Sequence, residues 1–269
     1  MYNDHVCVTR HHEDQLTATL IVLAHPEPRS FNSAWAGKTQ EVCTGMGDTV
    51  LTSNLSEMAF DPVESRIHYS HLAAHEPFDP LKAQETAAIM QLLPRDVVSE
   101  VDKLRRADRV VFHFPLWWFS PPAVLKGWFE RVLAHGETHS VTDRFDRGQF
   151  SGRKALFCVT TGSQEPESAF DGREGDVQML LWPLAYALRY VGFSVLVPET
   201  VHGVHGYHEG ARRNALQARL QTVLDSQQSL LQDWDNRPEL QFNSDDDFDA
   251  RGRLKSDRPS HSYFIRHGP

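Results

Sequence analysis

The sequence is poor in cysteine and has no long apolar run. Its three cysteines, Cys7, Cys43 and Cys158, lie far apart, and no CxxC pair occurs. This pattern argues against a disulfide framework and indicates a reducing, cytoplasmic compartment. No apolar stretch approaches the roughly 18 residues of a membrane span, and the first fifteen residues lack the apolar core of a signal peptide. We therefore expect neither membrane insertion nor a secretory leader.

Basic charge is also scarce. Asp and Glu outnumber Lys and Arg by 36 to 27, which gives a formal net charge of −9. The chain therefore lacks the basic footprint of a nucleic-acid or acidic-membrane binder. The dinucleotide motif GxGxxG, the phosphate-loop motif GxxxxGK[ST] and any fixed-period repeat are absent as well. The length of 269 residues and the 40% hydrophobic content suit one globular α/β domain with a tail.

Short apolar runs alternate with helical patterns along the chain. Strands are predicted at 18–24, 48–55, 109–114, 154–160 and 193–198, and helices at 31–44, 81–106, 121–135, 175–191 and 209–234. Ser30 should cap the first helix, and Ser120 followed by Pro121 should begin the third. Buried strands joined by helical crossovers predict a doubly wound, five-stranded parallel sheet with helices on both faces. Residues 1–17 would extend this domain of 18–234, with a polar tail at 235–269.

Three loops follow the carboxyl ends of the first, third and fourth strands, where doubly wound sheets bind ligands. HPEPRSFN leads into a helix N-terminus, which favours a phosphate through its free N–H groups. PLWWFSPP supplies flat aromatic surface, and TTGSQEPESAFDGREG begins with small residues that let backbone N–H groups approach a ring. A phosphate pocket, an aromatic floor and a donor loop together fit a flavin.

Four segments carry a family resemblance. IVLAHPEPRSFN, FHFPLWWFSPPAVLKGWFERV, TTGS and LLWPLAYALRYVGFSVL resemble, in order and spacing, the NAD(P)H:quinone oxidoreductase family of flavodoxin-like flavoproteins. The resemblance covers about residues 18–213 and implies a flavodoxin-like fold and a homodimer with the active site at the subunit interface. It also implies ping-pong transfer: NADPH or NADH reduces the flavin and leaves, and a quinone then takes two electrons. The long form with its tail favours FAD over FMN.

The resemblance assigns binding roles to the three loops. It places His25, Phe31 and Asn32 at the flavin pyrophosphate, Pro115, Leu116, Trp117, Trp118 and Phe119 against the isoalloxazine, and Thr160, Thr161, Gly162 and Ser163 at its pyrimidine edge. Ser30, at the N-terminus of the first helix, is a further candidate for the phosphate. Arg213 would lie near the adenosine end. Asp79 replaces a polar residue that usually contacts the flavin, so it is a further candidate.

The chain departs from the family at the reacting face. Ser168 and Glu174 stand where diaphorase-type enzymes place a Tyr and a His over the flavin. An ionised Glu174 would repel negative charge on the reduced ring, whereas an imidazole could become cationic. His139 and Val141 replace frequent tyrosines in the roof of the substrate pocket, which makes His139 a candidate for substrate contact. The acceptor could therefore be a specialised quinone, an azo or nitro compound, or a biosynthetic intermediate.

Alternative readings accompany these assignments. Glu174 could be a solvated charge at the start of its helix. His202, His205 and His208 recur every third residue, but they lack a partner at ligand spacing, so we expect no metal site. Some relatives with this fold serve as ancillary partners of potassium efflux systems. The chain could accordingly be a regulatory or interaction subunit, with the acidic tail from Asp245 as its docking segment.

Overall fold

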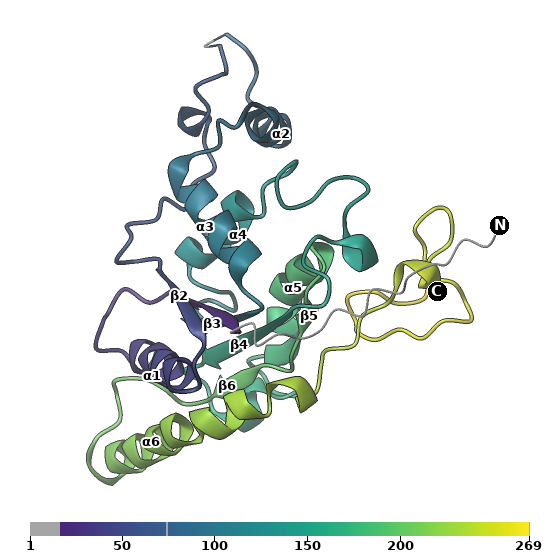
Figure 1. The fold of residues 1–269 in the computed structure, drawn as a ribbon. Helices are drawn as coiled ribbons and strands as arrows, with labels where there is room; N and C mark the ends of the chain where they lie inside the picture. Colours follow the sequence, from purple (N-terminus) through teal and green to yellow (C-terminus); the bar gives the residue numbers. More distant parts are fainter. Residues whose placement is uncertain (1–16, 74, 269) are drawn as a thin grey trace, which may run out of the picture.

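The computed structural model describes residues 17–73 and 75–268 (Figure 1). Cys7 and nearly all of the expected N-terminal extension lie outside these residues. The sheet contains β1 (Ala18–Leu23), β2 (Thr49–Asn54), β3 (Arg109–Pro115), β4 (Lys154–Thr160), β5 (Ser194–Val195) and β6 (Glu199–Val201). The strands pair in parallel in the order β2-β1-β3-β4-β5, with β6 pairing with β4 beyond β5. This is the doubly wound, flavodoxin-like order, so the predicted fold class is confirmed.

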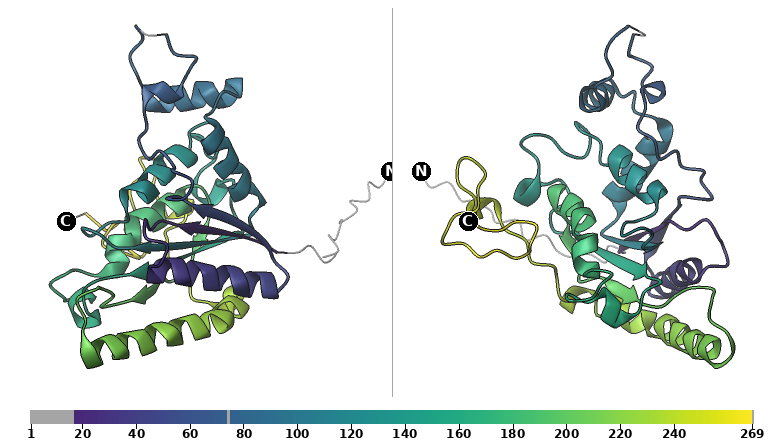
Figure 2. Two further views of the ribbon diagram at one scale, coloured as in Figure 1. Left: turned by 90° about the vertical axis from the view of Figure 1, so that its left-hand side faces the viewer. Right: turned by 180° about the vertical axis from the view of Figure 1, so that it is seen from behind.

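Helices cover both faces of the sheet. α1 (Phe31–Gly45) and α6 (Gly210–Gln232) lie on one face, and α3 (Arg95–Arg106), α4 (Ala123–Val132) and α5 (Val177–Tyr190) lie on the other (Figure 2). Each layer has its own apolar core, because the central strands bury side chains on both faces. α2 (Pro80–Met90) projects beyond the layer that contains α3 and α4 (Figure 1).

Two predicted elements were wrong in detail. The helix predicted at 81–106 is two helices, because Gln91 is left-handed (φ 57°) and Pro94 precedes the first residue of α3. The strand predicted at 193–198 is β5 alone, and β6 follows it, so the sheet has six strands among the described residues. Pro198 separates the two because proline cannot donate a ladder hydrogen bond.

Of the two predicted helix N-terminal caps, one is confirmed and one is wrong. Ser30 caps α1 as predicted, since its Oγ accepts a hydrogen bond from the Ser33 amide at 3.2 Å. Ser120 does not begin α4. Pro122 precedes that helix without a side-chain cap, and the Ser120 backbone pairs with Trp117 instead.

A buried polar network joins α1, β3 and α6. Trp35 Nε1 donates to Gln227 Oε1 at 2.7 Å, and Gln227 Nε2 donates to Thr39 Oγ1 at 2.9 Å. The Thr39 hydroxyl itself donates to the Trp35 carbonyl, so His113 Nε2, at 3.0 Å from Thr39 Oγ1, must carry the proton. His113 is fully buried, and desolvation lowers its pKa to about 3.

We expect His113 to make the protein acid-sensitive. The unfolded chain binds a proton at His113 below pH 6.5 and the folded chain does not, so stability falls as the pH drops from 6.5 toward 3. The loss is about 1.4 kcal/mol per pH unit, or about 2 kcal/mol between pH 6.5 and 5. Urea unfolding across this range should show a shallower pH dependence for His113→Gln. An identical slope in the variant would contradict the assignment.

The C-terminal segment after α6 packs partly on the α/β unit. Leu240 is buried, and Phe242 lies against Trp182 and Tyr186 at ring distances of 5.2 and 6.1 Å. Beyond residue 248 most side chains are exposed, and the segment forms the lobe coloured yellow in Figure 1. Within the described residues, no helix is long and apolar enough to span a bilayer.

Candidate functional site

A strained turn follows β3. Trp117 and Ser120 exchange backbone hydrogen bonds of 2.9 and 3.1 Å, and both intervening residues are left-handed, with φ of 50° at Trp118 and 61° at Phe119. This conformation costs roughly 1–2 kcal/mol for each residue with a side chain. Trp118 is 93% exposed and Phe119 is 53% exposed. The fold thus holds two aromatic rings at the surface at an energetic cost, which is typical of ligand sites.

The loop after β4 lies beside this turn. The Leu116 amide donates to the Thr160 carbonyl at 2.8 Å, which joins the two loops. Thr161 Oγ1 donates to the Ser163 carbonyl at 3.0 Å and fixes the backbone around Gly162. An added Cβ at Gly162 would meet nothing within 4 Å. The peptide at Gly162 therefore borders open space.

Two adjoining cavities lie between these loops. The first, of about 260 Å³, is lined by Leu116, Trp118, Phe119, Thr161, Gly162 and Ser163 from the predicted set, with Val177 and Leu180 of α5. The second, of about 450 Å³, adds Pro115, Trp117 and Thr160 and extends to Val204 and His205. The structure therefore brings together the loops that follow β3 and β4.

The loop after β1 reaches the same edge. His25 lies edge-on to Trp117, with ring centroids 5.7 Å apart. Its Nδ1 accepts a hydrogen bond from the Glu27 amide at 3.0 Å, and burial lowers the pKa of His25. The neutral ring therefore carries its proton on Nε2, where it can donate to a ligand.

Asn32, in the first turn of α1, has an unsatisfied donor. It is 3% exposed, and its Oδ1 accepts a hydrogen bond from Thr160 Oγ1 at 2.9 Å. Its Nδ2 has no partner among the described residues. Leaving a buried N–H group unpaired costs about 1–3 kcal/mol. An acceptor bound at this helix N-terminus, such as a phosphate oxygen, would remove that cost, so the residues present fit an anionic cofactor.

Comparison with known proteins agrees with this geometry. A family model described as "Flavodoxin-like fold" matches residues 17–224. NAD(P)H dehydrogenase [quinone] 1 of Rattus norvegicus is 38% identical over 214 residues, which are 76% of each chain. Ribosyldihydronicotinamide dehydrogenase [quinone] of Homo sapiens is 36% identical over 209 residues, 76% of this chain and 90% of that protein. The chain belongs to the NAD(P)H:quinone oxidoreductase family of flavodoxin-like proteins.

A solved structure shares the fold of this chain. A putative quinone reductase from Klebsiella pneumoniae superposes with a TM-score of 0.77 at 27% identity, covering 89% of this chain and 94% of that one.

The two residues that the resemblance marks as departures, Ser168 and Glu174, lie at the first cavity. Ser168 and Glu174 both line it, although they come from the loop between β4 and α5. Ser168 Oγ is 2.5 Å from Ser163 Oγ, which ties this loop to the Gly162 peptide. Glu174 is held through its amide, which donates to the Glu167 carbonyl at 2.9 Å, and its side chain is 3.7 Å from Arg173. Both candidates therefore share a cavity with the aromatic turn.

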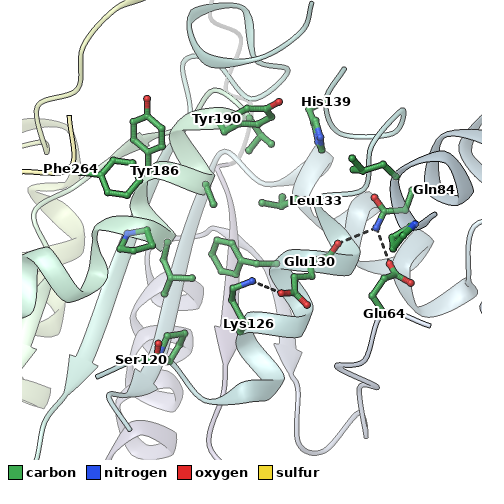
Figure 3. Close-up of a pocket in the computed structure, with 18 of the residues that line it drawn as sticks. Glu64, Gln84, Ser120, Lys126, Glu130, Leu133, His139, Tyr186, Tyr190 and Phe264 are labelled. Carbon is green, nitrogen blue, oxygen red and sulfur yellow. Dashed lines mark hydrogen bonds and ion pairs between the residues drawn. The ribbon is translucent and has the colours of Figure 1, made fainter. Parts of the chain in front are cut away.

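His139 lies elsewhere, in an apolar groove of about 700 Å³ between α4 and α5 (Figure 3). Its ring lies edge-on to Tyr190 at 5.1 Å, and desolvation, with smaller contributions from His135 and Arg144, lowers the pKa of His139 to about 4. Val141 is exposed. Within one chain, His139 is therefore not among the residues that line the two cavities.

Asp79 and Arg213 are likewise absent from the linings of both cavities. Asp79 caps α2, with its Oδ1 accepting a hydrogen bond from the Lys82 amide at 3.3 Å, and Arg213 is an exposed residue in the first turn of α6.

Sequence reasoning missed His205 and Val204. They reach the second cavity because the Val204 amide donates to the Thr161 carbonyl at 2.8 Å. That contact depends on β6, whose three residues carry no apolar run from which it could be predicted. The three histidines of this segment do not share one set of contacts. His202 contacts Thr161 Oγ1, whereas His205 stacks on His208 with ring centroids 3.9 Å apart. The described residues contain no cluster of three potential metal ligands.

Proposed function

We propose that the protein is a flavin-dependent NAD(P)H oxidoreductase that passes two electrons by a ping-pong route to a quinone or a related acceptor. The observation that carries this proposal is the unpaired, buried Nδ2 of Asn32, whose Oδ1 accepts a hydrogen bond from Thr160 at the start of the Gly162 loop. The names of the rat and human relatives, both dehydrogenases with quinone in their names, support the same reaction class. A bound flavin would supply the hydride acceptor and donor.

The chain's own residues would bind and orient that ring. Trp118 and Phe119 offer the exposed aromatic surface against which it can stack. The loop at Gly162 lets backbone N–H groups reach its polar edge without a side chain in the way. Ser168 and Glu174 border the same space and are our candidates for contact with the reacting groups.

The second cavity favours FAD over FMN. It continues from Trp117 past Thr161 to His205, so it offers room beyond the ring and its first phosphate. A diphosphate and an adenosine would extend along this direction, with the neutral His25 and the first turn of α1 as donors. Arg213 remains our candidate for the adenosine end.

The apolar groove between α4 and α5 supports a homodimer. Leu133, Tyr186 and Phe264 border it, and a groove with an apolar lining can receive the apolar side chains of a second copy (Figure 3). A second copy seated there would give His139 a route to substrate held at the partner's cavity. In such a dimer His139 could contact substrate although it does not line the two proposed flavin cavities of its own chain.

The proposal is tested on purified protein by its visible spectrum. We expect a bound flavin, identified as FAD after release and chromatography, that is bleached anaerobically by NADPH or NADH and recoloured by a quinone. If an azo or nitro compound recolours the flavin and quinones do not, the acceptor belongs to another class, and the protein is still an oxidoreductase. Flavin-loaded protein that neither nucleotide bleaches would contradict the proposal and favour the regulatory subunit.

The contacts of the C-terminal tail bear on the alternative proposal of a regulatory subunit that docks through this tail. Its first part is structural, since Leu240 is 5% exposed and Phe242 packs on Trp182. Asp247 accepts hydrogen bonds from the Ser244 amide and Asn243 Nδ2, both at 3.0 Å, so this carboxylate orders the chain locally. These contacts favour a tail that completes the enzyme over one kept free for docking.

A further inference from the structure

A third cavity, of about 500 Å³, lies between the first turns of α5 and the C-terminal segment 260–266. α5 contributes Gln178 and Trp182, and the C-terminal segment contributes His261, Tyr263 and Arg266. The polar and cationic groups of this lining distinguish it from the apolar groove between α4 and α5.

The C-terminal segment is locally ordered. The Ser260 hydroxyl hydrogen-bonds to the carbonyls of Ser262 and Ile265, at 3.0 and 2.5 Å, and the Phe264 amide donates to Ser262 Oγ at 3.1 Å. Phe264 anchors the turn on Tyr186, with ring centroids 5.0 Å apart. The residues on either side of Phe264 are therefore held against α5.

This cavity adjoins the candidate flavin site. Tyr263 stacks on Phe170 at 5.9 Å and 26°, and Phe170 belongs to the same loop as Ser168 and Glu174, which line the first cavity. The first turn of α5 separates the two spaces, because Val177 borders one and Gln178 borders the other. A long ligand with one end over the aromatic turn would have to pass the first turn of α5 to place its other end in the third cavity.

The charges of the cavity suit an anion with a flat ring. Arg266 makes no salt bridge within the described part of the chain, whereas Arg251 and Arg258, which precede this segment in the tail, pair with Asp249 and Asp247. The carboxylate in the lining, Asp176, caps α5 by accepting a hydrogen bond from the Gln178 amide at 2.8 Å. An anion would therefore lie toward Arg266, away from that helix end. Guanidinium groups bind phosphates through paired hydrogen bonds, and an exposed tyrosine ring can stack on a purine.

We propose that this cavity binds the adenosine 2′-phosphate end of the dinucleotide donor, with Arg266 on the phosphate and Tyr263 on the adenine. The protein then prefers NADPH to NADH. The inference rests on the proposed function, because the nicotinamide end of the same donor must lie over the flavin in the first cavity.

The test is calorimetric titration of flavin-loaded protein with NADP⁺ and NAD⁺. We expect NADP⁺ to bind about tenfold more tightly, as one charge-assisted contact provides. Arg266→Ala should weaken NADP⁺ about tenfold and leave NAD⁺ unchanged, and Arg266→Glu should weaken NADP⁺ further. Tyr263→Ala should weaken both dinucleotides. The matched control is Arg251→Ala, which removes an arginine of the tail that does not line the cavity and should change neither affinity.

A short donor separates the two proposals. Dihydronicotinamide riboside has no phosphate or adenosine, so it should bleach the flavin equally in the wild type and in every variant. If NADP⁺ and NAD⁺ bind alike, or if Arg266→Ala weakens both equally, the subsite is wrong and the oxidoreductase stands. If no reduced nicotinamide bleaches the flavin, the proposed function fails, and this inference fails with it.

Discussion

Replacing Gly162 by valine is expected to lower flavin retention without unfolding the protein. An added Cβ at this position meets no atom within 4 Å and Gly162 has no left-handed backbone, so the folded apoprotein accepts the larger side chain. The valine methyl groups would occupy the first cavity, where we place the ring edge. Overpacking of a fitted site costs about 1–3 kcal/mol, which corresponds to a loss of flavin affinity of up to about a hundredfold.

The measurement is the flavin-to-protein ratio after gel filtration, together with the melting temperature of each apoprotein. Gly206→Val is the control, because Gly206 also has no atom within 4 Å of an added Cβ and does not line either flavin cavity. We expect this control to keep both the flavin and the melting temperature. If the Gly162→Val protein keeps a full complement of flavin, the ring does not lie in the first cavity.

The shared edge of the cofactor loops could be predicted from the sequence alone. Buried strands 18–24, 109–114 and 154–160 are each followed by a distinctive loop, and the carboxyl ends of parallel strands meet at one edge. His25, Trp118 and Gly162 follow from that rule without any knowledge of packing. Their grouping needed only the strand order, which the crossover rules restrict to a few possibilities.

The positions of Asp79 and His139 could not be predicted in the same way. Both lie in long connections whose paths depend on tertiary contacts. One such contact is Gln84 Oε1, which accepts a hydrogen bond from the His135 amide at 3.0 Å. The third cavity is similar, because its tail residues are mostly exposed and polar and carry no periodic pattern. Local propensity therefore predicted which loops meet at one edge of the sheet, but not the surfaces where we place the donor and a second copy.

Replacing Gly127 by alanine is expected to destabilise the protein by about 3 kcal/mol, at the upper end of the cost of overpacking. Gly127 lies in α4, where an added Cβ would fall 2.1 Å from the Pro62 carbonyl oxygen and 2.5 Å from Pro62 Cα. These are backbone atoms, so no rotamer change relieves the clash. Separating the 61–64 segment from α4 would also stretch the 2.7 Å hydrogen bond from Arg131 Nη1 to the Asp61 carbonyl and leave a buried guanidinium short of an acceptor.

Gly37→Ala in α1 makes the same change in a helix with open space around the new methyl group. Alanine is a better helix former than glycine by roughly 0.5–1 kcal/mol, so this control should stabilise the protein. Although both variants replace glycine by alanine, their free energies of unfolding, measured in urea, should therefore shift in opposite directions. Equal and favourable shifts would mean that the 61–64 segment yields to α4 at little cost. In that case the wall of the groove that contains Glu64 would be adaptable, and a second copy seated there would meet a surface that adjusts to it.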